Sequence, residues 1–118
     1  MVVLCAEDDD RILLFLSRLL IADGFTVLSA GDGEAALELS RNYSGSIDLL
    51  LSDVKMPRMN GLELCEIMAS ERPETKVLMM SGDFESREQV SMRGLAFVQK
   101  PFTARSLQES IERLLGPI

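Results

Sequence analysis

The chain has 118 residues, of which 47% are hydrophobic and 26% are charged, a composition typical of an ordered globular domain. The formal net charge of −7 argues against a broad nucleic-acid-binding surface, and the absence of histidine removes the commonest catalytic base and zinc ligand. The apolar runs are too short to span a membrane, and two cysteines inside apolar segments indicate buried free thiols. We therefore expect a single cytoplasmic domain over residues 1–118.

Short apolar runs of strand length alternate along the chain with segments of helical length. The expected strands are 2–6, 26–29, 47–52, 76–80 and 96–98, and the expected helices are about 9–22, 32–42, 61–71, 87–93 and 104–115. Alternation repeated five times predicts an α/β domain built on a parallel sheet. The continuous hydrophobicity of the runs IDLLLS and KVLMMS is typical of strands that are covered on both faces.

Capping residues set the expected ends of the helices. Asn60 and Glu63 form a capping box for the third helix, and Thr103 is expected to cap the last one. Ser86 and Gln89 form a further potential box, which predicts that the fourth helix begins late and is short.

Four consecutive acids separate the first strand from the first helix. Asp9 is expected to be the N-cap of that helix, and Asp10 is a first-turn charge that the helix dipole favours. Glu7 and Asp8 come directly after the strand. We therefore expect only these first two acids to belong to a functional site.

Polar side chains follow the carboxyl ends of four of the predicted strands. Glu7 and Asp8 follow the first strand, Asp53 the third, Ser81 the fourth and Lys100 the fifth. The carboxyl ends of parallel strands share one edge of the sheet, and doubly wound sheets place their ligand sites there. We therefore expect three carboxylates, a hydroxyl and an ammonium group to meet at this edge.

This set of groups is suited to metal-assisted phosphoryl transfer. Clustered carboxylates without histidine or cysteine favour a hard divalent cation, above all Mg²⁺. A carboxylate can also act as a nucleophile and form an acyl phosphate. Such a transfer needs alignment and neutralisation of charge, which a metal ion, the Lys100 ammonium and the Ser81 hydroxyl can supply.

At this point the sequence resembles the receiver domain of two-component response regulators over essentially its whole length. The motifs that carry the resemblance are VVLCAEDD, LLSDVKMPRMNGLEL, VLMMSG and FVQKPF, in this order along the chain. The resemblance implies a three-layer, flavodoxin-like (βα)5 fold with strand order 2-1-3-4-5. It also implies a signalling switch that takes a phosphoryl group from a kinase phosphohistidine in a Mg²⁺-dependent reaction, rather than an enzyme acting on an outside substrate.

The resemblance assigns roles to the residues at matching positions. Asp53 is implied to be the phosphoacceptor and a Mg²⁺ ligand, with Asp8 as a second direct ligand. Glu7 is implied to act through a bound water, and the backbone carbonyl of Lys55 to complete the protein ligands. Lys100 is implied to contact the phosphoryl oxygens.

Further positions are implied to govern switching and the lifetime of the phosphorylated form. Ser81 would donate its hydroxyl to a phosphoryl oxygen, and Phe97 matches an aromatic position that changes rotamer with it, although it also suits a core position of a short strand. The peptide bond before Pro101 is cis in the family. Lys55 and Asp83 match positions that tune hydrolysis, and we expect them to pair across the mouth of the site; the alternative is two independent solvated side chains.

The first helix carries an apolar pair outside its expected core stripe. At 100° per residue, four side chains form that stripe: Ile12, Phe15, Leu16 and Leu19. Leu14 and Ile21 fall nearly opposite and suggest a docking site for a sensor histidine kinase or a histidine phosphotransfer protein, since receivers meet partners through this helix; scattered surface residues are the alternative.

The spacing between Ser81 and Lys100 and the AFVQKPFT segment resemble the receivers of hybrid sensor kinases, so other domains of a parent kinase are expected partners too. We expect neither nucleic acid nor a membrane to bind this domain.

Three other classes account for parts of the pattern. A haloacid-dehalogenase-like phosphatase with an aspartyl nucleophile needs a second aspartate where Lys55 stands. An FMN-binding flavodoxin needs a Ser/Thr-rich phosphate loop where the four acids stand. A degenerate receiver that takes no phosphate is opposed by the complete set of five site residues.

Overall fold

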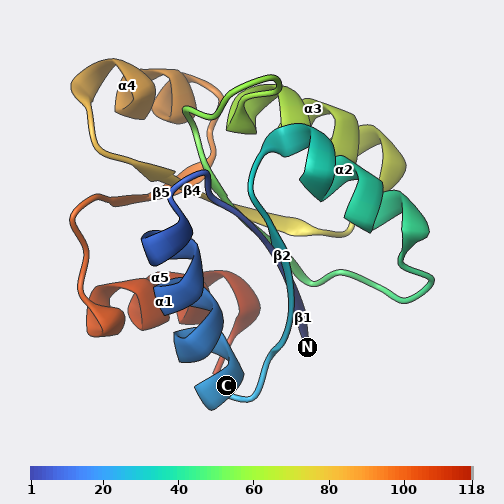
Figure 1. The fold of residues 1–118 in the computed structure, drawn as a ribbon. Helices are drawn as coiled ribbons and strands as arrows, with labels where there is room; N and C mark the ends of the chain where they lie inside the picture. The colour runs from blue at the N-terminus through green and yellow to red at the C-terminus, as the bar shows by residue number, and fades with distance from the viewer. Residues whose placement is uncertain (118) are drawn as a thin grey trace.

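The computed structural model describes residues 1–117, in which strands and helices alternate along the chain (Figure 1). The strands are β1 (Val2–Ala6), β2 (Thr26–Ala30), β3 (Leu49–Asp53), β4 (Lys76–Ser81) and β5 (Ala96–Gln99). The helices are α1 (Asp10–Ala22), α2 (Gly33–Asn42), α3 (Gly61–Glu71), α4 (Phe84–Met92) and α5 (Ala104–Leu115). All ten expected elements are present.

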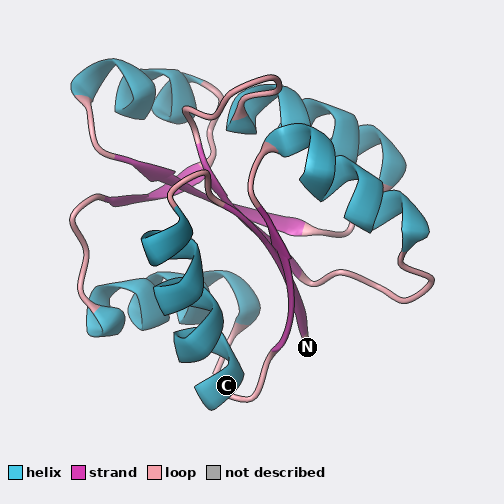
Figure 2. Ribbon diagram, in the orientation of Figure 1, coloured by secondary structure: helices cyan, strands magenta, loops and turns pink. Residues whose placement is uncertain are grey.

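The five strands form one parallel sheet in the order β2-β1-β3-β4-β5, which confirms the expected fold class and strand order. Figure 2 shows the sheet between two layers of helices, with α1 and α5 on one side and α2, α3 and α4 on the other. A helix of the described chain long and apolar enough to cross a membrane is not found.

The central strands are apolar without interruption because both faces of the sheet are covered. Leu4 and Leu50 face the layer of α2, α3 and α4, whereas their neighbours Val3, Leu49 and Leu51 face α1 and α5. Successive side chains of a strand point to opposite faces, so each of these strands contributes to both halves of the core. Cys5 and Cys65 are free and buried, as expected.

Most expected helix ends are confirmed. The Asp9 side chain accepts hydrogen bonds from the backbone N–H groups of Arg11 and Ile12, so Asp9 caps α1. The Asn60–Glu63 capping box opens α3, and Thr103 caps α5.

The expected start of α4 was wrong. The helix begins at Phe84, because Asp83 is its N-cap and accepts hydrogen bonds from both the backbone N–H and the hydroxyl of Ser86. Ser86 is therefore already inside the first turn. A carboxylate three residues upstream took the capping role, which lengthens the helix at its start relative to the expected segment.

The expected core stripe of α1 was also partly wrong. Leu16 and Leu20 are fully buried against the sheet and α5, whereas Phe15 is 47% exposed. Leu14 and Ile21 are exposed, as expected. The helix is turned so that Phe15 lies at the border of the core, beside the segment that follows β5.

Candidate functional site

The register of the sheet brings the expected site residues to one edge. Three register pairs fix the alignment of the strand ends: Ala6 with Ser52, Asp53 with Met80, and Ser81 with Gln99. Glu7 and Asp8 follow β1, and Lys100 follows β5, so these side chains emerge at the same level as Asp53 and Ser81. The topological expectation from the sequence is therefore met.

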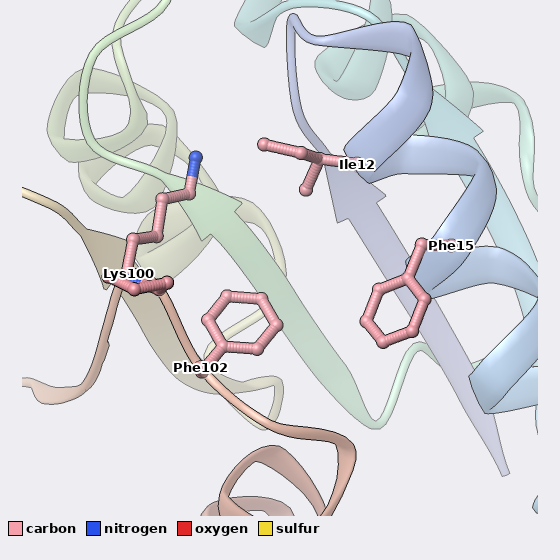
Figure 3. A pocket seen from close by; sticks show the side chains of 5 residues that line it. Ile12, Phe15, Lys100 and Phe102 are labelled. Atoms are coloured by element: carbon pink, nitrogen blue, oxygen red, sulfur yellow. The ribbon is translucent and has the colours of Figure 1, made fainter.

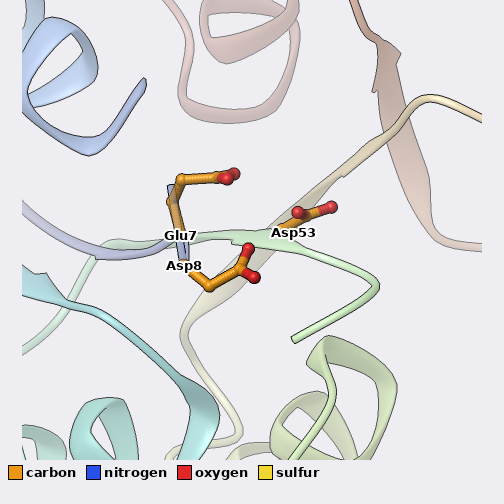
Figure 4. A group of neighbouring side chains, drawn as sticks. All are labelled: Glu7, Asp8 and Asp53. Carbon is orange, nitrogen blue, oxygen red and sulfur yellow. The ribbon is translucent and has the colours of Figure 1, made fainter. Parts of the chain in front are cut away.

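Three carboxyl groups converge at this edge. Glu7, Asp8 and Asp53 each offer an oxygen atom within 4.8 Å of the others (Figure 4). Glu7 is buried, Asp53 is partly buried and Asp8 is exposed, so the cluster runs from the interior to the surface. An ion could enter from the Asp8 side, where the cluster opens to solvent.

Lys100 joins the two inner carboxylates. Its Nζ donates to Oε2 of Glu7 at 2.8 Å and to Oδ2 of Asp53 at 3.0 Å. The other oxygen of Glu7 accepts a hydrogen bond from the backbone N–H of Asp9 at 3.2 Å. The peptide bond between Lys100 and Pro101 is cis, as the resemblance implied.

Burial dominates the electrostatics of this cluster. It raises the pKa of Glu7 and of Asp53 above the ordinary carboxyl range, and repulsion from neighbouring carboxylates adds to the rise while Lys100 opposes it. Burial alone would lower the pKa of Lys100, but its bonds to Glu7 and Asp53 raise the pKa above its usual value. When ionised, three carboxylates face one ammonium, which leaves an excess of negative charge that a divalent cation would neutralise.

The donor set fits a hard divalent cation. All three candidate side-chain ligands offer oxygen, the donor atom that Mg²⁺ prefers, and the described site contains no competing histidine or thiol ligand.

Ser81 has a buried hydroxyl without a partner. The residue is 1% exposed, and its Oγ makes no hydrogen bond with any group of residues 1–117. An unpaired buried polar group costs about 1–3 kcal/mol, so such groups are rare in native structures without a reason. The hydroxyl is therefore available to an oxygen atom that arrives in the site.

Phe97 lies on β5 and is 38% exposed. It does not belong to either buried core cluster of the described chain. The interpretation of Phe97 as an ordinary core residue is therefore not supported.

The expected pair at the mouth of the site is formed. The Nζ of Lys55 lies 3.3 Å from Oδ2 of Asp83, and the two side chains are 69% and 41% exposed. The pKa of Asp83 is lowered first by the backbone N–H of Ser86 and further by Lys55. Asp83 therefore has two functions in the structure, as the cap of α4 and as the partner of Lys55.

The loop between β3 and α3 (residues 54–60, the β3–α3 loop) closes tightly on itself. Gly61 donates its N–H to the carbonyl of Val54 at 2.9 Å, and a Cβ on Gly61 would overlap the backbone oxygen of Asp53. Only glycine fits there. The position of Gly61 at the expected start of a helix gave no sign of this close approach to the site.

The β3–α3 loop also forms a second ion pair, which was not predicted from the sequence. Arg58 has a left-handed backbone conformation, with φ of 66°, and its guanidinium binds the carboxylate of Asp32 at the start of α2. The two residues are 26 positions apart, and no local pattern links them.

A mainly apolar groove lies beside the site. It has a volume of about 340 Å³, and Ile12 and Phe15 of α1 face Lys100 and Phe102 across it, with Pro101 completing the lining (Figure 3). Leu14, one of the two proposed docking residues, lines an adjoining groove on the outer face of α1 together with Phe15.

A family model and two relatives match nearly the whole chain. The family model described as "Response regulator receiver domain" matches residues 3–112. The sensor kinase CckA of Brucella abortus is 32% identical over 116 residues, which cover 96% of this chain and 12% of the kinase. The transcriptional regulatory protein CpxR of Escherichia coli K12 is 34% identical over 116 residues, which cover 96% of this chain and 48% of CpxR.

A solved structure agrees with these sequence relatives. The crystal structure of the receiver domain from the hybrid histidine kinase CckA matches with a TM-score of 0.82 and 33% identity, over 98% of this chain and 99% of that one. The chain spans less than half the length of the two sequence relatives. The relatives include a hybrid kinase receiver, as the sequence suggested, and also a transcriptional regulator.

Proposed function

The chain belongs to the response regulator receiver domain family, the phosphoacceptor switches of two-component systems, and on that premise we propose that Asp53 is its phosphoacceptor. One observation carries this assignment. Lys100 bridges Asp53 and Glu7 at the carboxyl edge of the sheet, next to the Ser81 hydroxyl, which has no hydrogen-bond partner within residues 1–117. We assign the whole sequence, 1–118, to one receiver domain and place it in the cytoplasm; Ile118 lies outside the described residues.

In this proposal Mg²⁺ is held by oxygen atoms of four residues. Asp8 and Asp53 are direct ligands, Glu7 acts through a bound water, and the backbone carbonyl of Lys55 completes the protein contribution. When bound, the ion neutralises charge on the transferring phosphoryl group. Glu7 is already engaged by Lys100 and the Asp9 N–H, which supports its indirect role.

The chain's own residues carry the transfer. A carboxylate oxygen of Asp53 attacks phosphorus, the bond from phosphorus to the donor imidazole nitrogen breaks, and the electron pair stays on that nitrogen. Lys100 moves its ammonium from the Asp53 carboxylate to the phosphoryl oxygens. Ser81 then donates its hydroxyl to one of these oxygens, and Phe97 changes rotamer in response. The domain acts only on its own aspartate in this scheme.

The proposed phosphodonor is a sensor histidine kinase or a histidine phosphotransfer protein, including one within a parent hybrid kinase. We propose that it docks on the outer face of α1 through Leu14 and Ile21. Both are exposed, and Leu14 lies next to the groove that leads to Lys100. Substituting both with glutamate should slow transfer from the cognate kinase and leave transfer from a small phosphodonor unchanged.

Lys55 and Asp83 are proposed to limit access of the attacking water. Their ion pair crosses the mouth of the site, and both groups are too exposed to add measurable stability. Lys55→Ala should therefore shorten the lifetime of phosphorylated Asp53. The release of inorganic phosphate over time measures this lifetime. An unchanged lifetime would show that the pair has no such role.

Mass spectrometry of the phosphorylated protein tests the assignment of Asp53. The protein is incubated with Mg²⁺ and phosphoramidate, and the modified residue is located after trapping the acyl phosphate. We expect modification of Asp53, none in Asp53→Asn, and normal modification in Asp10→Asn, which removes an acid of the same run outside the cluster. Phosphate on another residue, or none in the wild type, would overturn the assignment.

The phosphatase alternative makes a different prediction. It requires steady turnover of an outside substrate such as p-nitrophenyl phosphate. We expect no turnover beyond the slow cycle of phosphorylation and hydrolysis at Asp53.

A further inference from the structure

An ion pair between Arg58 of the β3–α3 loop and Asp32, the N-cap of α2, connects the loop to this helix. Arg58 donates through Nε to Oδ2 of Asp32 at 3.1 Å, and its terminal nitrogen binds the same oxygen. The other oxygen, Oδ1, accepts the backbone N–H of Ala35 at 2.8 Å. Asp32 is buried and caps α2, so the arginine is fixed to a rigid point rather than to a mobile side chain.

The backbones meet at the same place. A Cβ on Gly33 would overlap the backbone oxygen and the side chain of Met59, so the start of α2 and the loop are in direct contact. Arg58 itself has a φ of 66°, a conformation that costs a non-glycine residue free energy. Conformations of this kind persist where the surroundings hold them, and the bond to Asp32 supplies such a constraint.

The loop has a second support on its other side. Lys55 reaches Asp83 at the start of α4, and Gly61 closes the base of the loop on Val54. The two ion pairs anchor Lys55 and Arg58 to different helices. The segment between them thus has a contact on both flanks of the site, and the contact that ends on buried Asp32 is the one that can hold it, because the Lys55–Asp83 pair is exposed.

We propose that Arg58 is a positioning residue of the phosphoryl site: its ion pair with Asp32 holds the β3–α3 loop so that the backbone carbonyl of Lys55 is in place for the divalent cation. The inference rests on the proposed function, in which that carbonyl is a metal ligand. A preset carbonyl spares the ion the free energy of ordering the loop, so the pair acts through metal affinity.

A Mg²⁺ titration without phosphodonor tests the proposal. The dissociation constant is measured from backbone amide NMR shifts of the wild type, Arg58→Ala and Asp32→Asn. Asparagine caps helices as well as aspartate does, so Asp32→Asn removes the ion pair and keeps the cap. We expect each variant to bind Mg²⁺ roughly three- to tenfold more weakly, the range of a modest charge-assisted contact.

Two further variants separate the ion pair from other effects. Arg58→Lys keeps the positive charge but lacks the two guanidinium donors that bind Asp32, so it should retain part of the Mg²⁺ affinity that Arg58→Ala loses. Arg58→Asn tolerates the left-handed conformation but loses the pair, so it should bind as weakly as Arg58→Ala. The double variant Asp32→Asn/Arg58→Ala should bind Mg²⁺ no more weakly than the weaker of the two single variants. The same Arg58–Asp32 ion pair is lost in all three proteins.

Arg41→Ala is the matched control. Arg41 forms a similar bidentate arginine–carboxylate pair with Glu71 at the C-terminal ends of α2 and α3, the opposite ends of these helices from the Arg58–Asp32 pair. Its loss should leave the Mg²⁺ affinity unchanged. Phosphorylation of Arg58→Ala should be slow at low Mg²⁺ and approach the wild-type rate at saturating Mg²⁺, which a loss of folded protein would not produce.

The outcomes distinguish this inference from the proposed function. Wild-type phosphorylation on Asp53 with equal Mg²⁺ affinity in Arg58→Ala would overturn the role of Arg58 alone. Wild-type affinity in Arg58→Asn with weak binding in Arg58→Ala would assign the effect to backbone conformation and also overturn it. If Mg²⁺ binding is weakened in the variants but the wild-type protein is phosphorylated on a residue other than Asp53, the role of Arg58 in holding the loop is supported and the assignment of Asp53 as phosphoacceptor is overturned.

Discussion

The amino edge and the carboxyl edge of the sheet differ in how fully their polar groups are hydrogen-bonded. At the amino edge, Arg72 donates to the carbonyls of Ser40, Tyr43 and Gly45, and also to the Ser40 hydroxyl. Thr75 likewise donates its hydroxyl to the carbonyl of Ile47 at 2.8 Å. These bonds close the loops that enter β3 and β4.

The carboxyl edge is less fully satisfied within residues 1–117. Ser81 has a buried hydroxyl without a partner among the described residues, and the pKa values of Glu7 and Asp53 are raised by burial. The amino edge therefore contributes stability, whereas the described carboxyl edge has an unpaired hydroxyl and an excess of carboxylates that a phosphoryl group and a cation can satisfy. Changes at the two edges should have effects of different kind and sign.

The largest effect on stability is expected at the amino edge. Arg72→Ala leaves three backbone carbonyls without their donor and should lower the free energy of unfolding by about 2–4 kcal/mol. Urea unfolding measures this loss. Phosphorylation of Asp53 in the folded fraction should stay normal, because the side-chain hydrogen bonds of Arg72 join it to Ser40, Tyr43 and Gly45 at the opposite edge. An Arg72→Ala variant with unchanged free energy of unfolding, or one that folds but is not phosphorylated, would contradict the view that the amino edge serves stability and the carboxyl edge serves phosphorylation.

Mg²⁺ should stabilise the protein through the carboxyl edge. A ligand that binds only the folded state adds about 1.4 kcal/mol at a tenfold excess over its dissociation constant. The unfolding midpoint of the wild type should rise with Mg²⁺, while that of Asp8→Asn should respond much less. Ca²⁺-free, EDTA-treated protein is the reference for both. Equal responses would place the ion elsewhere.

A pair of hydroxyl deletions should have opposite signs at the two edges. Thr75→Val removes a satisfied hydrogen bond and should lower the free energy of unfolding by about 1 kcal/mol. Ser81→Ala removes an unsatisfied buried hydroxyl and should leave stability unchanged or raise it by up to about 1 kcal/mol. Urea unfolding of both variants decides the point. If Ser81→Ala clearly lowered the free energy of unfolding, the Ser81 hydroxyl would have a hydrogen-bond partner in the unphosphorylated protein.

The carboxyl edge was largely predictable from sequence because topology assembles it. In a parallel sheet, residues that follow successive strands share one edge regardless of their separation in the chain, so Glu7, Asp53 and Lys100 could be brought together from strand positions alone. Helix ends with one capping candidate, such as Thr103, were equally predictable. Local patterns decide these features.

Features that depend on competition or on long-range contacts were not predictable. Asp83 and Ser86 are both good N-caps three residues apart, and Asp83, which also pairs with Lys55, takes the role. The rotation of α1 that exposes Phe15 depends on how the helix meets the sheet, which periodicity does not record. The Arg58 pair joins loops that no local pattern connects.

The pH dependence of stability should separate a carboxylate whose pKa is governed by burial from one whose pKa is governed by its hydrogen bonds. The pKa of Glu7 is raised by burial, so the folded state retains a proton that the unfolded chain has lost. Its contribution favours folding at low pH and is lost as the pH rises through the raised pKa. Without Mg²⁺, the stability of the wild type relative to Glu7→Gln should therefore fall as the pH rises above the ordinary carboxyl range.

Asp32 should show the opposite sign in the same experiment. Its pKa is lowered, first by the backbone N–H of Ala35 and then by Arg58, so its contribution is present above the unfolded pKa and is lost as the pH falls. The stability of the wild type relative to Asp32→Asn should therefore fall on acidification. Urea unfolding across the acidic to neutral range, in Mg²⁺-free buffer, measures both differences. Slopes of the same sign for Glu7 and Asp32 would contradict the contrast, because burial raises the pKa of a carboxylate and hydrogen bonds to its ionised form lower it.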